Sequence, residues 1–209
     1  MIIKFNDFLN ESKMVNFDES DSNFVVMMGA PGAGKTFSVN TFLNLRDFKY
    51  INVDTYRENI AKKLGLDVSK PEDNLKILDM TYTTSDPRNK TILFLKRFLT
   101  DKISYNKPLP NVVFDAGGSQ VDVIKNILKL AEFAGYKTTL VYVKTDLELD
   151  LMRNRDRERK LTDEMVIDYY NRCESTYDYL KQFYDNVWII FNNAPYDPTQ
   201  RNTVIQKVK

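Results

Sequence analysis

A glycine-rich octapeptide is the part of this sequence whose residue types and spacing point most directly to chemistry. Its residues are Gly29, Ala30, Pro31, Gly32, Ala33, Gly34, Lys35 and Thr36. They satisfy the pattern G-x-x-x-x-G-K-[ST] in full, and glycines there let successive backbone N–H groups point into one concavity that binds phosphate oxygens. The Lys35 ammonium adds positive charge toward the outer phosphates of a nucleotide, and the Thr36 hydroxyl can ligate Mg²⁺. We therefore predict that this octapeptide, the phosphate loop, binds ATP.

Two aspartates follow short apolar runs that are typical of buried strands. Asp54 comes directly after residues 50–53, and Asp115 comes directly after residues 112–114. Because ligands of an open parallel sheet bind at the carboxyl ends of its strands, we expect both carboxylates to face the nucleotide. Asp115 has two functional interpretations, an outer ligand to Mg²⁺ or a group that positions the acceptor. Its structural alternative is a turn residue before the two glycines at 117–118.

Asp54 and Arg57 form the candidate acceptor site. They are three residues apart at the start of a predicted helix, so they share one of its faces. A carboxylate can orient an acceptor hydroxyl and take its proton, while a nearby cation holds a phosphate or another anion on the acceptor. The alternative is that Asp54 only caps its helix and Arg57 makes a surface salt bridge.

A run of cations follows in the second half of the chain. Residues 153–160 hold five of them in eight positions, namely Arg153, Arg155, Arg157, Arg159 and Lys160. If the run begins as a helix, Arg153 and Arg157 lie on one face, where an arginine over a moving phosphoryl group can be worth ~10³–10⁵ in rate. We predict a lid over about residues 153–161 that closes on bound nucleotide and excludes water. The alternative is a solvated helix end in which acidic residues interleave with the cations.

The composition removes several other kinds of chemistry. The 209 residues contain no histidine and a single cysteine, Cys173, which excludes a Ser-His-Asp triad, histidine acid–base chemistry and an intramolecular disulfide. Thirty basic and 29 acidic residues give a net charge of +1, which argues against coating nucleic acid through bulk charge. No apolar run approaches the ~20 residues of a membrane span and no signal-peptide core is found, so we expect a cytoplasmic protein.

Strand and helix patterns alternate along the chain. The apolar runs predict strands at 24–28, 50–53, 112–114, 138–143 and 187–191. The helical patterns fall at 35–45, 55–64, 91–103, 124–134 and from 162 to about 180. The fold class we expect is α/β, a three-layer P-loop NTPase fold with a mostly parallel five-stranded sheet flanked by helices. This domain is predicted to span residues 23–209, with residues 1–22 as an N-terminal extension.

These elements together resemble a known group of proteins. Residues 24–191 look like the small P-loop kinases of the polynucleotide-kinase and zeta-toxin group, above all the kinase domain of the tailed-phage 5′-polynucleotide kinase. The likeness is strongest at residues 29–36, at 50–57 and around Arg153, Asn154 and Arg157. It implies Asp54 as the general base, Arg57 as the arginine that binds a substrate phosphate, and a lid that carries Arg153 and Arg157. It also implies the strand order of kinase-type P-loop folds and transfer of the ATP γ-phosphate to a hydroxyl.

The acceptor stays open at this point. Residues 116–118 depart from the group's usual loop, and residues 66–107, which shape the acceptor pocket, show no clear match. The preferred acceptor is a nucleic acid 5′-OH end, and the alternative is a nucleotide sugar or another small metabolite, as for zeta-type toxins. A function of another class is a nucleotide-binding switch or a virion-packaged protein that no longer transfers phosphate. Asn192 and Asn193, beyond the last predicted strand, either approach the adenine or form a turn.

The N-terminal segment has a resemblance of its own. Phe5, Phe8, Leu9 and Glu11 are spaced as in the short leader of internal head proteins of large tailed phages, which is cut after a Leu-x-Glu sequence. The resemblance implies association with a phage head through residues 1–11. The alternative is a short amphipathic helix that docks on its own domain.

Overall fold

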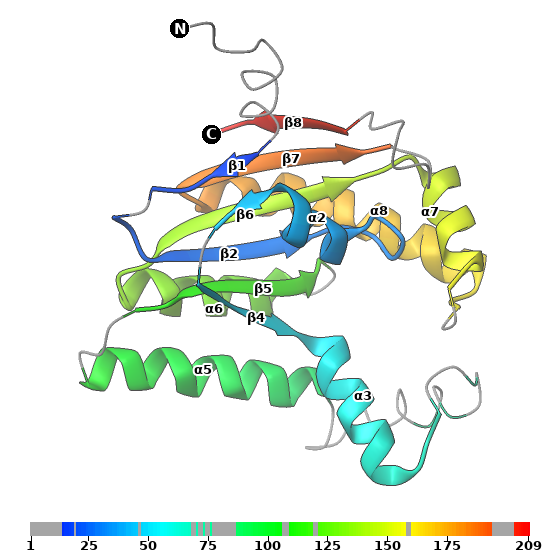
Figure 1. Ribbon diagram of the computed structural model, residues 1–209, viewed down its shortest axis with the longest axis horizontal. Helices are drawn as coiled ribbons and strands as arrows, with labels where there is room; N and C mark the ends of the chain where they lie inside the picture. The colour runs from blue at the N-terminus through cyan, green and yellow to red at the C-terminus, as the bar shows by residue number, and fades with distance from the viewer. Residues whose placement is uncertain are drawn as a thin grey trace, which may run out of the picture.

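A six-stranded sheet forms the centre of the protein (Figure 1). The computed structural model describes residues 14–18, 20–45, 47–67, 70, 73, 76, 87–105, 109–118, 121–157, 160–193 and 203–209. In sheet order the strands are β4 (Phe48–Asn52), β5 (Asn111–Gly117), β2 (Asn23–Met28), β6 (Lys137–Lys144), β7 (Asn186–Asn192) and β8 (Thr203–Lys207). The first five are parallel and β8 runs antiparallel to β7. The carboxyl ends of five strands therefore meet at one edge.

Strand β2 lies in the middle of this sheet and carries the core on both faces. All six of its residues are buried, as expected for a parallel strand that is covered on both sides. Because successive side chains alternate, Phe24, Val26 and Met28 join one core cluster, while Val25 and Met27 join the other. Both faces of β2 are therefore anchored in the core, which fixes the point at which the following loop begins.

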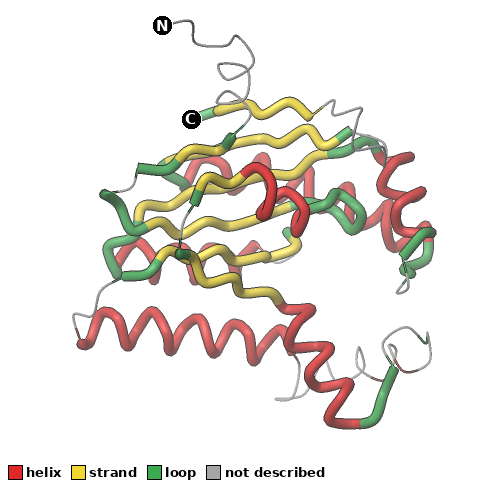
Figure 2. Tube along the Cα trace, in the orientation of Figure 1, coloured by secondary structure: helices red, strands yellow, loops and turns green. Residues whose placement is uncertain are grey.

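The helices cover the two faces unequally (Figures 1 and 2). They are α2 (Lys35–Phe42), α3 (Val53–Leu64), α5 (Pro87–Tyr105), α6 (Val121–Phe133), α7 (Leu147–Arg155), α8 (Asp163–Leu180) and the short 3₁₀ helix η2 (Lys181–Phe183). Helices α6 and α8 lie behind the sheet with α5 beside α6, and α2 lies in front. No helix in the described ranges is long and apolar enough to cross a membrane.

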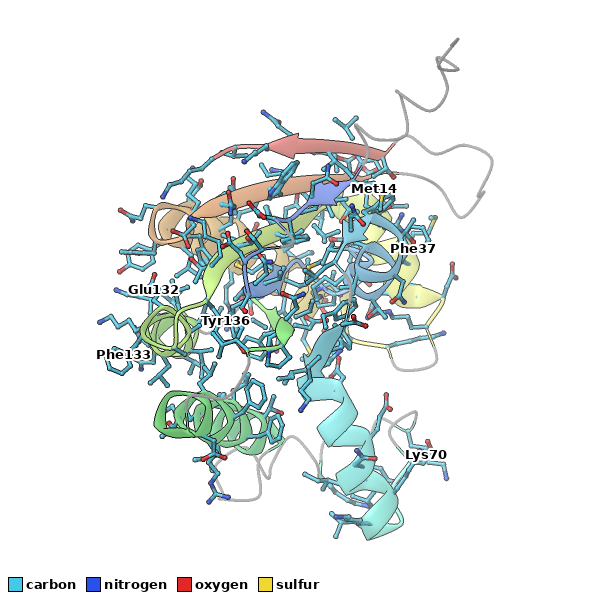
Figure 3. All side chains as sticks on the ribbon, turned by 60° about the vertical axis from the view of Figure 1, so that its left-hand side comes forward. Met14, Phe37, Lys70, Glu132, Phe133 and Tyr136 are labelled. Carbon is cyan, nitrogen blue, oxygen red and sulfur yellow. The ribbon has the colours of Figure 1, made fainter. Side chains whose placement is uncertain are left out.

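The helices predicted at 124–134 and from 162 to about 180 are confirmed as α6 and α8, and α6 begins three residues earlier, at Val121. Thr162 caps α8 by accepting the N–H of Met165 at 3.3 Å, and Gly135 ends the helical region of α6 at φ +89°. The inner residues of α6 are buried in the first cluster, whereas Phe133 on its outer side is 77% exposed. Phe133 and Phe37 of α2 lie at the outer surface (Figure 3).

Residues before position 23, where the domain is predicted to begin, already contact the core. Strand β1 (Val15–Asn16) pairs in parallel with β3 (Leu43–Asn44), and Val15 is fully buried in the second core cluster. For this reason α2 ends at Phe42 and not near residue 45. The division between an extension and a domain stays a prediction. The leader-like residues 1–11 lie outside the described residues.

The fold class is confirmed, and the number of strands is corrected. The main sheet has six strands, not five, because β8 adds an antiparallel edge strand. Its segment has little apolar pattern, since only Thr203 is buried and Val204 is exposed. An edge strand needs fewer apolar residues than a central one, so periodicity did not reveal it.

Candidate active site

The phosphate loop connects β2 to α2 at the carboxyl edge of the sheet (Figure 1). The residue before the helix is Gly34, which has φ +85° and no side chain to cap the helix. The N–H groups of the first turn and the positive end of the helix dipole therefore stay available for an anion. This is the local geometry that the octapeptide predicts.

Two loop glycines are required by their neighbours as well as by their backbone angles. A Cβ on Gly32, at φ +100°, would lie 2.7 Å from the backbone oxygen of Asp150 on α7. A Cβ on Gly34 would lie 2.5 Å from Nδ2 of Asn192 at the end of β7. The loop is thus enclosed from outside by two other elements.

Lys35 bends back over the loop that precedes it. Its Nζ donates to the carbonyl oxygens of Gly29 at 2.9 Å and Ala30 at 3.4 Å. The ammonium is held above the concavity, where phosphate oxygens can take the place of these carbonyls. This position fits the predicted role of Lys35.

A tyrosine joins the two predicted Mg²⁺ ligands. The Tyr50 hydroxyl donates to Oδ2 of Asp115 at 3.0 Å, and the Thr36 side chain lies close enough to it to lower its pKa. Burial first, and then the Asp115 charge, raise the pKa of Tyr50 to about 12, so it stays a neutral donor. Asn52 Nδ2 also approaches Oδ2 of Asp115 at 3.4 Å, and the N–H of Gly117 donates to Oδ1 at 3.3 Å. The structure therefore brings Thr36 and Asp115 to one place.

Asp54 lies in the first turn of α3, two strands away from β2. The helix begins at Val53, and its cap is Asn52, whose Oδ1 accepts the N–H of Asp54 at 2.7 Å. The alternative in which Asp54 caps the helix is therefore wrong, because the preceding asparagine does so. The Asp54 carboxylate is exposed at the carboxyl edge. Arg57 lies on the same helix, but its side chain is outside the described residues.

Arg153 contacts the phosphate loop from α7. Its Nη1 donates to the carbonyl oxygen of Gly32 at 3.2 Å, and its Nη2 donates to that of Asn192 at 3.1 Å. Helix α7 ends at Arg155, so Arg157 follows the helix and does not share a helical face with Arg153. Arg157 is exposed, while Arg155 pairs with Asp163. Among the described cations of this segment, Arg153 thus holds the phosphate loop, Arg155 pairs with α8, and Arg157 and Lys160 are exposed.

Asp150 is a site residue that the sequence did not reveal. It is fully buried on α7, Oδ1 accepts from the Thr145 hydroxyl, and Oδ2 has no hydrogen-bond partner within the described part of the chain. Burial raises its pKa to about 6, although Thr145, Lys35 and the charges of Arg153 and Arg157 act in the opposite direction. No local pattern marked it, because the buried residues of α7, Asp150 and Asn154, are both polar.

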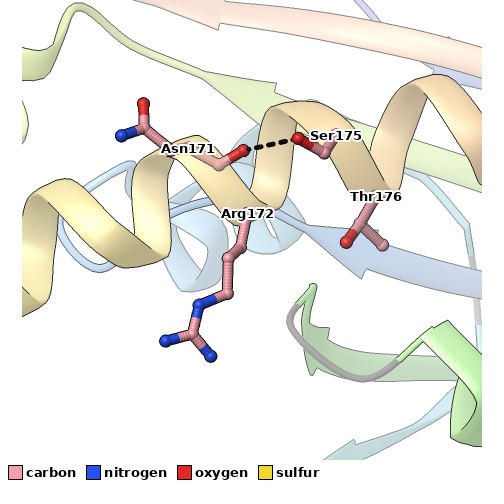
Figure 4. A pocket seen from close by; sticks show the side chains of 4 residues that line it. All are labelled: Asn171, Arg172, Ser175 and Thr176. Atoms are coloured by element: carbon pink, nitrogen blue, oxygen red, sulfur yellow. Dashed lines mark hydrogen bonds between the residues drawn. The ribbon is translucent and has the colours of Figure 1, made fainter.

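Helix α8 closes the site from the other face of the sheet. Cys173 Sγ donates to the carbonyl oxygen of Gly117 at 3.2 Å, and burial raises the pKa of this thiol to about 11. A shallow pocket on the same helix is lined by Asn171, Arg172, Ser175 and Thr176 (Figure 4). None of these four belongs to the phosphate loop, and Arg172 pairs with Asp168. The pocket is therefore a separate feature.

Comparison with known proteins agrees with this geometry. A family model described as "AAA domain" matches residues 24–174, which include the phosphate loop, Asp54, Asp115 and Arg153. No curated protein matches the sequence.

Solved structures share the fold at low identity. One from the PezAT chromosomal toxin–antitoxin system of Streptococcus pneumoniae is 16% identical with a TM-score of 0.53, over 98% of this chain and 78% of that one. The AvrRxo1-ORF1:-ORF2 structure with ATP is 14% identical with a TM-score of 0.57, over 88% and 57%. A structure of the Pnkp1/Rnl/Hen1 RNA repair complex is 15% identical with a TM-score of 0.50, over 78% of this chain and 48% of that one. The chain thus spans about half the length of the last two. Because the family match covers most of the chain and includes the phosphate loop, this protein belongs to the AAA domain family of P-loop proteins.

Proposed function

We propose that this protein is an Mg²⁺- and ATP-dependent kinase that transfers the γ-phosphate to an acceptor hydroxyl. The observation that carries the proposal is the Tyr50 hydroxyl, which donates to Asp115 and lies near Thr36 beside the phosphate loop. A hydroxyl and a carboxylate that meet next to a phosphate-binding loop are the oxygen donors that Mg²⁺ prefers. This arrangement supports an ATP site built for phosphoryl transfer.

Thr36 and Asp115 would hold the metal ion in different ways. The Thr36 hydroxyl fits direct contact, whereas both oxygens of Asp115 already accept hydrogen bonds from protein groups. Asp115 therefore fits the outer position, where a carboxylate accepts from a metal-bound water. When bound, Mg²⁺ neutralises charge on the phosphates and orients them.

The remaining residues have roles around the moving phosphate. Lys35 binds the outer phosphates from the loop, and Asp54 takes the proton of the acceptor hydroxyl. Arg57, one helical turn later, anchors an anionic group of the acceptor. Arg157 clamps the negative charge that develops during transfer, and Arg153 supports this step by holding the phosphate loop at Gly32. These roles rest on the residue types and on the shared carboxyl edge.

The preferred acceptor is a nucleic acid 5′-OH end, and a nucleotide sugar is the second candidate. Two similar structures come from an RNA repair complex and from a toxin–antitoxin system, so both acceptors belong in one test. The alternative outside the enzymes is a nucleotide-binding switch, or a virion-packaged protein that no longer transfers phosphate.

The test offers γ-labelled ATP and Mg²⁺ with 5′-OH DNA and RNA, nucleotide sugars and nucleosides. Label should move to one of these acceptors, and Asp54→Asn should lower the transfer rate by about 10²–10⁴-fold, as for loss of a general base. The affinity for ATP should stay within about twofold, because Asp54 lies outside the phosphate loop. The matched control is Glu58→Gln, an exposed acid one turn along the same helix.

Other outcomes separate the alternatives. Transfer to none of the acceptors while ATP binds would leave the switch or packaged protein and reject the kinase. Equal rates for Asp54→Asn and Glu58→Gln would reject Asp54 as the base. Lys35→Ala should abolish function in every class, so it serves only to show that ATP binding is needed.

A further inference from the structure

The end of β7 is joined directly to the phosphate loop. Asn192 is the last residue of the strand, and its Nδ2 donates to the carbonyl oxygen of Ala33 at 2.8 Å. The two residues are 159 positions apart in the chain. The Asn192 side chain is buried, at 3% exposure, so this bond is made without competition from water.

Arg153 closes a second connection between the same elements. Its guanidinium donates to the carbonyl oxygens of Gly32 at 3.2 Å and Asn192 at 3.1 Å. The backbone of Asn192 thus holds Arg153 while its side chain holds the loop. Two consecutive carbonyls, at Gly32 and Ala33, are each held by a donor from outside the loop.

Holding a carbonyl also orients an N–H group. A trans peptide points its C=O and N–H in opposite directions, so a bond from Asn192 to the Ala33 oxygen turns the Gly34 N–H the other way. The Ala33 N–H is already used in a turn to the Ala30 oxygen at 3.2 Å. The Gly34 N–H is therefore the group whose direction depends most on Asn192, and it precedes the first turn of α2.

The contact also explains the glycine at position 34. The Asn192 amide occupies the space that a Cβ would need, with 2.5 Å between Nδ2 and that position. The contact between Asn192 and residue 34 is therefore possible only when residue 34 is glycine.

We infer that Asn192, together with Arg153, is a positioning residue that sets the shape of the phosphate loop without touching the nucleotide. Asn192 acts on bound phosphates through the backbone of residues 32–34. The other interpretation of this asparagine, a contact with the adenine, predicts a different pattern of binding.

Calorimetric titration of the full chain with inorganic tripolyphosphate and with ATP distinguishes the positioning role from a contact with the adenine. Asn192→Ala should raise the dissociation constants of both about tenfold, the cost expected for one lost buried hydrogen bond. The control is Asn186→Ala, at the opposite end of the same strand, which should leave both constants unchanged. Thermal unfolding, measured in parallel, shows that each variant is folded at the temperature of titration.

Arg153 offers the second variant. Arg153→Lys keeps the charge but cannot donate to two separated carbonyls at once, so tripolyphosphate binding should again weaken several-fold. The double variant, Asn192→Ala with Arg153→Lys, should weaken tripolyphosphate binding by less than the product of the two single fold-changes, because both residues hold the same loop. If Asn192→Ala does not fold, Arg153→Lys carries the test alone.

Weaker binding of ATP with unchanged tripolyphosphate would show a contact with the base and overturn the inference. Unchanged binding of both would overturn it as well. These titrations need no acceptor, so they can fail or succeed independently of the proposed kinase activity.

Discussion

Asp150 is a buried carboxylate beside the phosphate loop. Its backbone encloses Gly32, and its charge lies near Lys35, Arg153 and Arg157 without a direct ion pair to Oδ2 among the described residues. Tyr170 and Cys173 of α8 also lie close enough for its charge to raise their pKa values. When it is ionised, Asp150 therefore offsets part of the positive charge of these three cations.

The raised pKa of Asp150 predicts a pH-dependent stability. The folded-state pKa is about 6 and the ordinary value is 3.8, so the protonated form favours the fold and this contribution is lost as pH rises from about 4 through 6. Asp150→Asn should therefore increase the free energy of unfolding at pH 8 by about 1–3 kcal/mol, and by almost nothing at pH 4. Urea unfolding between pH 4 and pH 8 measures this change in the free energy of unfolding, with the exposed substitution Asp156→Asn as a control. A variant that is less stable at pH 8 would show that Oδ2 is paired in solution.

At the scale of elements, the segment after α7 is shaped by one asparagine. Asn154 is almost fully buried, and its side chain both donates to the Leu161 oxygen at 2.8 Å and accepts the Leu161 N–H at 3.1 Å. Asn154 therefore joins the last turn of α7 to the residue that precedes the cap of α8. The described residues that follow Arg155 in the predicted lid do not continue α7, which ends at that residue.

Loss of that tether should expose the loop to proteolysis. Asn154→Ala removes two hydrogen bonds, so local opening becomes easier and trypsin should cut after Arg155 and Arg157 about 5–30-fold faster. Limited digestion with mass spectrometry identifies the sites. Asn171→Ala, an exposed change on α8, should digest like the original protein. Equal rates for both variants would mean that Asn154 does not hold the loop.

At the scale of the molecule, β8 protects the strand that holds the phosphate loop. It pairs with β7 at five positions, from Trp188 with Lys207 to Asn192 with Thr203. The chain end adds hydrogen bonds from Lys209 Nζ to the backbone of Tyr184 and Gln182. The site therefore depends on an edge strand that contributes no side chain to it.

Removal of residues 203–209 should weaken both the fold and phosphate binding. Five cross-strand pairs at about 0.2–1 kcal/mol each predict a loss of about 1–5 kcal/mol, and the bare β7 edge should promote association. Thermal unfolding and size-exclusion chromatography measure these effects, and tripolyphosphate titration shows whether Asn192 keeps its position. Val204→Thr, an exposed change on the intact strand, is the control. A truncated protein of unchanged stability would contradict this role for β8.

Local chemistry made much of this protein predictable from its sequence. The phosphate loop, the burial of β2, the cap at Thr162 and the apolar face of α6 each depend on residues that are neighbours in the chain or one helical turn apart. Patterns of that kind can be recognised without knowing the strand order. The same holds for Asp54 and Asp115, whose place after apolar runs marked the carboxyl edge.

The tertiary structure decided which of these residues meet. The bond from Asn192 to Ala33 spans 159 positions, that from Tyr50 to Asp115 spans 65, and Arg153 contacts Gly32 over 121. Such contacts depend on the order of strands and on the packing of α7 against the loop, which no local pattern encodes. The sequence by itself determined that a phosphate-binding loop exists, because its backbone conformation follows from eight adjacent residues. Only the fold decided what holds that loop in shape, because its supports come from the far ends of other strands.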